Sequence, residues 1–206
     1  MSTHLLTRRS YRPRTDLPLI GDLGLKRGRL HECCGTARHV FALMLAPHTD
    51  GPVFWITPRW GVDHLNPNGV APMLDPSRLI LTTPDRPEDL LWTMEEVLRS
   101  GTAALAIADI PGLPGLTPVR RLHLAAETGG TQTKTLPTGL ILTPGHGGAQ
   151  GVESRWQMDP QFTPNGQAWA LRRLRARSEP VADWHIQGDH GQFTVIKDRP
   201  HQPKST

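Results

Sequence analysis

Between residues 28 and 143, short apolar segments alternate with longer segments whose apolar residues recur at helical spacing. The clearest stretch has a helix-spaced segment at 86–101, an apolar segment at 103–109 that ends in Asp109, and a second helix-spaced segment at 116–130. Strands that alternate with helices form parallel sheets with right-handed crossover connections. The sequence therefore predicts an α/β protein with a mostly parallel central sheet.

The expected strands span residues 30–34, 53–57, 79–82, 103–109 and 140–143, and the expected helices span residues 36–46, 87–100 and 117–129. Residues 58–74 are rich in proline and glycine, which predicts an irregular segment with one short helical turn. After residue 144 the pattern changes to short alternating segments at 156–158, 169–174, 184–186 and 193–195. These segments predict antiparallel strands that extend the sheet.

At 206 residues, the chain has the length of a single domain. Residues 1–27 are polar, basic and interrupted by Pro13 and Pro18, which favours a flexible basic arm ahead of a domain at 28–197. Residues 198–206 are predicted to be a disordered tail. Residues 1–30 contain seven Lys or Arg against two acids, and residues 31–150 contain eight against eleven. Basic ends are compatible with contact to phosphate, but they are also ordinary solubilising charge.

The only cysteines, Cys33 and Cys34, are adjacent, so the chain lacks the spaced pairs of a disulfide framework. Neighbouring side chains of a strand point to opposite faces, which favours two inert thiols over a redox pair. No apolar run approaches the length of about 20 residues that a membrane span needs, and no apolar segment of a signal peptide follows the N-terminal arginines. A cytoplasmic protein without membrane contact is expected.

Residues 28–46 have the strand, loop and helix of a phosphate-binding loop, but they lack its defining residues. The pattern G-x-x-x-x-G-K-S/T needs a second glycine for backbone approach and a lysine for the β- and γ-phosphates. After Gly35 the chain has Thr36, Ala37, Arg38 and His39 instead. Gly35 to Arg38 are therefore predicted to be the vestige of a phosphate-binding loop, and no nucleotide or other cofactor is expected.

Asp109 ends a neighbouring strand, where a carboxylate could lie beside a bound phosphate. Without the loop lysine and a pair of Mg²⁺ ligands, a loop that only packs is favoured over a nucleotide site. The sequence also lacks a nucleophile elbow, a zinc-protease motif and a C-x-x-C pair. We therefore expect no catalytic residue, no metal site and no enzymatic activity.

Four segments resemble the ImuA family: GRLHE at 28–32, GPVFWI at 51–56, DPSRLILTTPDRPEDLLWTMEEVLRSG at 75–101 and TPVRRLHLAAE at 117–127. The resemblance extends from about residue 28 to about residue 188, and it implies a RecA-like three-layer core extended by the C-terminal antiparallel strands. ImuA proteins are RecA-like factors encoded beside ImuB, an inactive Y-family polymerase homologue, and an error-prone polymerase. The resemblance implies a non-catalytic factor in SOS translesion synthesis that binds ImuB, the polymerase and RecA.

The sequence leaves two other functions open. One is a RecA-type ATPase with weak nucleotide binding, and the other is a cell-division inhibitor similar to SulA, which captures a tubulin-like polymer. Nucleotide binding separates the first from a non-catalytic factor. Capture of ImuB rather than the division polymer separates the second.

Two regions are candidates for contact with a partner. At 100° per residue, Trp92 falls opposite the apolar stripe of its helix, which favours a partner anchor, although cover by a loop or the arm would also explain it. The segment 169–177 combines tryptophan with arginines, a composition that suits a protein acid or DNA phosphate. Its candidate contact residues are Trp169, Arg172, Arg173, Arg175 and Arg177. Strict alternation would place Trp169, Arg173, Arg175 and Arg177 on one face, where arginines could equally protect a sheet edge.

Overall fold

The computed structural model describes residues 16–61, 65–133, 136–164, 166–189 and 191–196. Its strands are β1 (Asp16–Ile20), β2 (Leu23–Lys26), β3 (Leu30–Cys34), β4 (Val53–Ile56), β5 (Leu79–Thr82), β6 (Leu105–Asp109), β7 (Thr138–Leu142), β8 (Ser154–Thr163), β9 (Gly166–Ala176), β10 (Ala182–Asp189) and β11 (Gln192–Ile196). Its α-helices are α1 (Arg38–Leu45), α2 (Pro67–Val70), α3 (Pro87–Ser100) and α4 (Leu116–Gln132).

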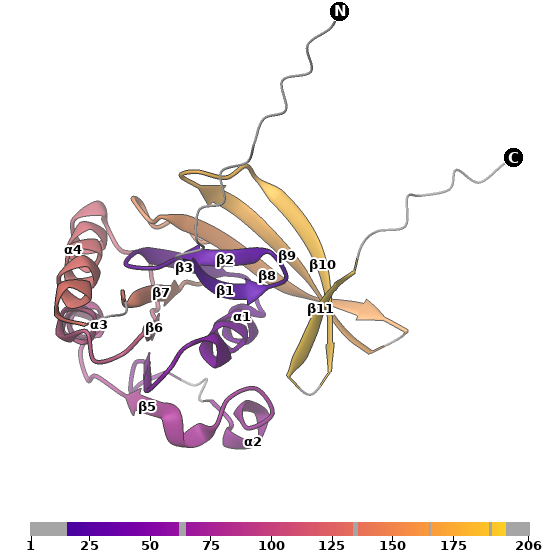
Figure 1. The fold of residues 1–206 in the computed structure, drawn as a ribbon, viewed down its shortest axis with the longest axis horizontal. Helices are drawn as coiled ribbons and strands as arrows, with labels where there is room; N and C mark the ends of the chain where they lie inside the picture. The colour runs from indigo at the N-terminus through magenta and orange to yellow at the C-terminus, as the bar shows by residue number, and fades with distance from the viewer. Residues whose placement is uncertain (1–15, 62–64, 134–135, 165, 190, 197–206) are drawn as a thin grey trace, which may run out of the picture.

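Nine of these strands form one sheet in the order β11-β10-β9-β8-β3-β7-β6-β4-β5 (Figure 1). Strands β3 to β8 are parallel to their neighbours among themselves, and β9, β10 and β11 extend the sheet by antiparallel pairing. The predicted α/β protein with a mostly parallel sheet and an antiparallel C-terminal extension is confirmed.

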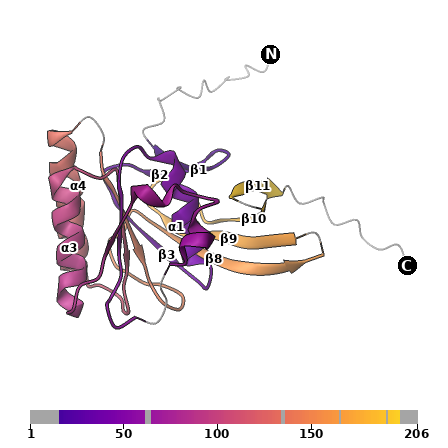
Figure 2. The same cartoon turned by 90° about the horizontal axis from the view of Figure 1, so that it is seen from below.

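The sheet is covered differently on its two faces. Helices α3 and α4 pack on one face, and α1 and the β1–β2 hairpin cover the other (Figure 2). Strands β4 to β7, which follow β3 in the sequence, all lie on one side of β3 in the sheet. The next strand, β8, lies on the other side of β3. The strand order therefore reverses at β3, and α/β proteins bind ligands outside the carboxyl ends of strands at such a point.

Helix α3 begins and ends where its sequence predicts. Pro87 occupies the first turn, which tolerates proline because its N–H would have no partner there, and Glu88 and Asp89 complement the positive end of the helix dipole. Gly101 ends the helix in the left-handed conformation at a φ of 65°. The apolar stripe faces the sheet, and its Leu90 is buried.

Helix α4 continues past Gly129, at which it was predicted to end. A side chain at Gly129 would collide with the carbonyl oxygen of Leu98 on α3. The glycine therefore permits the close approach of two helices, and it does not stop the second one. Composition alone does not distinguish these two uses of glycine.

The prediction of an extended arm is wrong for residues 16–26, which form the antiparallel β1–β2 hairpin. Leu17 and Leu25 pair in its register, and both are completely buried against the sheet. The strands are only five and four residues long, and Pro18 lies within the first, so their local signal is weak. Residues 1–15 of the predicted arm and residues 198–206 of the predicted tail lie outside the described residues.

Candidate functional site

The loop after β3 lies where the strand order reverses. Gly35 has a φ of 90°, and a side chain there would collide with the backbone oxygen of Met158 on β8. The N–H and the hydroxyl of Thr36 donate to Oδ1 of Asp159 over 2.9 and 3.1 Å. The Ala37 N–H donates to Met158 O over 2.9 Å. The loop is therefore fastened to β8 through the groups with which a phosphate loop would hold its ligand.

The anion that these donors contact is a carboxylate of the protein itself. Desolvation raises the pKa of Asp159, but hydrogen bonds from the Thr36 N–H, the Gln157 amide and the Thr36 hydroxyl outweigh it, so the pKa is lowered from its ordinary value. Asp159 is therefore ionised at neutral pH. A phosphate brought to this loop would meet a negative charge and donors that are already engaged.

Asp109 contacts the first turn of α1, so the structure brings this acid and the loop together as the sequence predicts. Its Oδ2 lies 2.6 Å from Nε2 of His39. Its Oδ1 lies 3.5 Å from Nε of Arg38, an ion pair by distance in which that N–H makes no hydrogen bond. Both carboxylate oxygens are thus occupied by α1. The His39 ring also lies 5.8 Å from the ring of Trp55 on β4.

Both cysteines of β3 are free and buried. Burial raises the pKa of Cys33 well above its ordinary value and raises the pKa of Cys34 to about 11. Thiols are nucleophilic as thiolates, so cysteines with raised pKa values react poorly. The structure therefore agrees with two inert core cysteines.

A buried glutamate that the sequence does not single out lies in the same strand. Glu32 has no exposed surface. Its carboxylate accepts hydrogen bonds from the Thr143 hydroxyl at 2.8 Å, from Nε of Arg155 at 2.5 Å, and from the N–H groups of Gly148 and Ala149 at 2.9 and 3.1 Å. The glycine-rich segment 145–151 is therefore anchored around this carboxylate. A buried charge is tolerated when it is paired and hydrogen-bonded in this way.

A second buried polar chain starts one residue earlier, at His31. The Trp156 Nε1–H donates to Oγ of Ser154 over 2.8 Å, and Oγ of Ser154 lies 2.7 Å from Nδ1 of His31. Nε2 of His31 lies 2.9 Å from the carbonyl oxygen of Lys26. These partners assign a neutral ring that donates from Nε2 and accepts at Nδ1. Burial, the largest effect, lowers the pKa of His31 to about 4.

The unfolding free energy is therefore expected to fall when the pH is lowered from 7 to 5. The unfolded chain protonates His31 near its ordinary pKa of 6.5, whereas the folded chain protonates it only near a pKa of about 4. The neutral ring makes its full contribution to the unfolding free energy above pH 6.5, and this contribution is lost as the pH falls from 6.5 to 4. Between pH 7 and 5 the loss is about 2 kcal/mol. Denaturant unfolding at both pH values measures the loss. An NMR titration that gives His31 a pKa near 6.5 in the folded chain would contradict this account.

The predicted single face of arginines on β9 is wrong. The register between β8 and β9 shifts between Arg155 and Trp156, which pair with Arg175 and Arg173. Leu174 is therefore an extra residue on β9, and the bulge places Arg173 and Arg175 on opposite faces of the sheet. Alternation along one strand cannot reveal a bulge, because the partner strand defines it.

Arg173 is an interior residue, with only 6 % of its surface exposed. Its guanidinium carbon lies 5.4 and 5.2 Å from the ring centres of Trp156 and Trp184. Its Nε–H donates to Pro180 O over 2.9 Å, and its Nη1 contacts Glu179. These contacts stabilise the packing of β8, β9 and β10, and they leave Arg173 little surface for DNA or a partner.

Of the other residues on and after β9 that were predicted to contact a partner or DNA, one is buried and three are exposed. Trp169 is buried, and its ring lies 5.5 Å from that of Phe193 on β11. Arg172, Arg175 and Arg177 are exposed. The exposed arginines are thus the members of this group that can reach a partner.

Trp92 lies on the outer side of α3, where the helical spacing places it. It is 57 % exposed, so the described part of the chain leaves more than half of its surface open to solvent. A large exposed aromatic side chain beside charged residues is typical of a binding hot spot.

The described residues contain no group of three or more His, Cys, Asp and Glu that could hold a metal ion. None of the described helices has the length and apolar character needed to cross a membrane. A scan against known protein families finds no match, and a search of curated proteins finds none either.

Proposed function

We propose that this chain is a non-catalytic accessory protein of the ImuA type in damage-induced translesion synthesis. Its partners in this proposal are an ImuB-like Y-family polymerase homologue, an error-prone polymerase and RecA, with DNA as a further contact. The resemblance of the segments at 28–32, 51–56, 75–101 and 117–127 supports it. The RecA-like character of the core and the cytoplasmic location are part of the same proposal.

The observation that carries the non-catalytic part is the occupied loop after β3. Thr36 donates twice to Asp159, and Asp109 is engaged by Arg38 and His39. A nucleotide site needs free donors for phosphate and a carboxylate available to Mg²⁺. Here the same groups hold α1, β6 and β8 together, so the loop supports the fold and leaves little for a ligand.

The binding part of the proposal is supported by apolar side chains that the described chain leaves exposed. Trp92 on α3 is one of them. Two more lie on β5, an edge strand that pairs, among the described strands, only with β4. They are Ile80 and Leu81, which are 40 and 57 % exposed. Exposed apolar residues on an edge strand either promote aggregation or receive a partner. These exposed apolar side chains are therefore better candidates for binding a partner than the loop after β3 is for binding a nucleotide.

Replacing Trp92 with alanine should weaken binding to the ImuB-like protein and leave the chain folded. Truncation of a central interface tryptophan costs about 2 kcal/mol or more of binding, which is a loss of roughly 30-fold. Because the side chain is more than half exposed, the loss of unfolding free energy should stay below about 1 kcal/mol. Calorimetric titration of ImuB and urea unfolding measure the two quantities.

A matched control is Val181→Ala, which truncates a side chain that is 68 % exposed in the segment before β10. It should change neither quantity. Unchanged binding of Trp92→Ala, or a loss of about 3 kcal/mol of unfolding free energy with binding intact, would contradict the proposed role of Trp92. Binding of a tubulin-like division polymer in place of ImuB would contradict the proposed function itself.

A further inference from the structure

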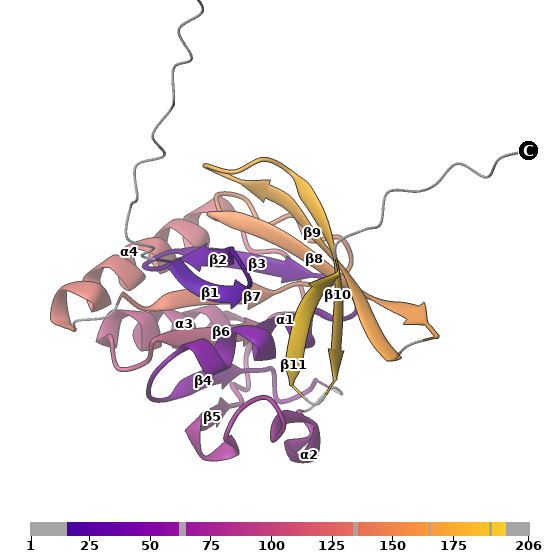
Figure 3. The ribbon, with the colours of Figure 1, turned by 45° about the vertical axis from the view of Figure 1, so that its right-hand side comes forward.

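The tip of the β8–β9 hairpin carries a large apolar side chain that no described residue covers. The hairpin projects beyond the parallel part of the sheet (Figure 3), and Phe162, near its end, is fully exposed at 105 % of its reference surface. Trp156 and Met158 point to the same face of β8, and both are buried. The face of β8 that is buried at Trp156 and Met158 therefore continues to Phe162, where the described part of the chain no longer covers it. A fully exposed phenyl ring is costly in water unless a partner buries it.

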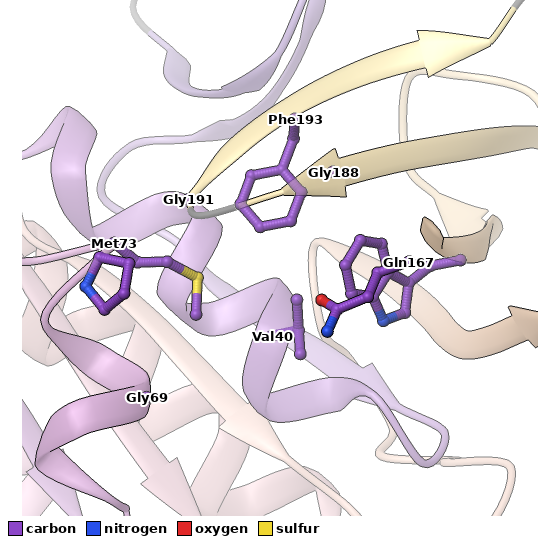
Figure 4. Close-up of a pocket in the computed structure, with 9 residues that line it drawn as sticks. Val40, Gly69, Met73, Gln167, Gly188, Gly191 and Phe193 are labelled. Carbon is purple, nitrogen blue, oxygen red and sulfur yellow. The ribbon is translucent and has the colours of Figure 1, made fainter. Parts of the chain in front are cut away.

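A recess lies on the same face of the sheet, beside this ring. It has a volume of about 200 Å³, and Figure 4 shows Val40 of α1, Met73, Gln167 of β9 and Phe193 of β11 around it. Pro72 and Trp169 add to its apolar lining. None of the residues that line the recess is charged. A cavity of about 150 Å³ is enough to hold benzene, so the recess is large enough for a phenyl ring.

The register of the strands places the ring and the recess in one row. Phe162 pairs with Gln167, Gln167 with Gly188, and Gly188 with Phe193. A side chain at Gly188 would collide with the ring of Phe193, so this glycine lets the Phe193 ring lie over β10 at the recess. The exposed phenyl ring and the recess therefore lie on the same sheet face, and Gln167, which lines the recess, is the direct neighbour of Phe162.

We propose that two copies of this chain associate through a two-fold contact in which Phe162 of each copy enters the recess of the other. A two-fold contact uses the same patch on both copies, and a patch that contains both a projecting ring and an apolar recess complements itself. The recess and the ring carry no charge, so two identical patches meet without repulsion between like charges. This self-association is a property beyond the proposed accessory function, and it does not depend on that function.

The size of the contact sets its strength. One phenylalanine buries about 150–250 Å², so two rings and their surroundings bury less than the roughly 1,200 Å² of a standard interface. A weak dimer follows, with a dissociation constant in the range of about 10 to 500 µM. The occupant is a second copy, whose Phe162 completes the lining of each recess.

Sedimentation velocity over about 10 to 1,000 µM tests the association. The wild-type chain should shift from monomer toward dimer, and Phe162→Ser should weaken the association at least 10-fold while its thermal midpoint stays unchanged. The matched control is Leu124→Ser, which removes an apolar side chain that is 61 % exposed on α4, over the opposite face of the sheet. It should dimerise like the wild type. A wild-type chain that stays monomeric, or a Phe162→Ser variant that dimerises like the wild type, would overturn the proposal.

Methyl-labelled methionine NMR identifies the contact independently of its strength. Ring currents from an entering Phe162 should shift the signal of Met73 as the concentration rises, and the signals of the buried Met94 and Met158 should stay in place. The shift should be absent in Phe162→Ser. Self-association that leaves the Met73 signal unmoved would place the interface elsewhere and refute the inference.

Discussion

The Arg155→Ala variant is expected to lose about 3 to 5 kcal/mol of unfolding free energy. Nε of Arg155 donates to Oε2 of Glu32 over 2.5 Å, and Glu32 has no exposed surface. Without the guanidinium, the buried carboxylate keeps only neutral donors, namely the Thr143 hydroxyl and the N–H groups of Gly148 and Ala149. An unpaired buried charge is among the most destabilising changes a side chain can cause. Urea unfolding measures the loss.

Arg175→Ala is the matched control, because Arg175 lies directly opposite Arg155 in the register but is exposed. Its unfolding free energy should stay within about 0.5 kcal/mol of the wild type. The double variant Glu32→Gln/Arg155→Ala, which removes both charges, should recover part of the loss. A loss below about 1 kcal/mol in Arg155→Ala would show that the segment 145–151 satisfies Glu32 without the arginine.

Local signals were sufficient for the parallel part of the fold. Helix α3 carries its own start and stop in Pro87 and Gly101, and each strand from β4 to β7 is a short, mostly apolar segment of its own. The β1–β2 hairpin was missed because its burial depends on contacts with the sheet, and those contacts are not encoded in its nine strand residues. The bulge at Leu174 was missed for a related reason, since only the partner strand reveals it.

The candidate site was predicted in outline but not in its chemistry. The sequence placed Gly35 and Asp109 at the same edge of the sheet and noted the missing lysine. It did not predict Asp159, which is separated from Thr36 by 123 positions and contacts it only because β8 returns beside β3. Glu32 was missed likewise, because its partner Arg155 is also 123 positions away. A carboxylate between Leu30 and Cys33, inside a predicted strand, was the available signal in that case.

The same geometry predicts that ATP and Mg²⁺ do not bind measurably. The loop donors of Thr36 are engaged by Asp159, whose pKa is lowered, so a triphosphate would approach an ionised carboxylate. Asp109 is also engaged within the protein, because His39 contacts one of its oxygens and Arg38 forms an ion pair with the other, and a Mg²⁺ ion would have to compete with both. A nucleotide site with lysine and free loop donors commonly gives micromolar affinity, whereas this loop should be weaker by at least about 1,000-fold, which corresponds to about 4.1 kcal/mol.

Calorimetric titration of the folded chain with ATP and Mg²⁺ tests the non-catalytic account most directly. The account predicts no saturable heat up to a nucleotide concentration of about 1 mM, and the same result for Asp109→Ala. A dissociation constant in the low micromolar range that is abolished by Asp109→Ala would contradict it, because the loop and the acid would then form a working nucleotide site.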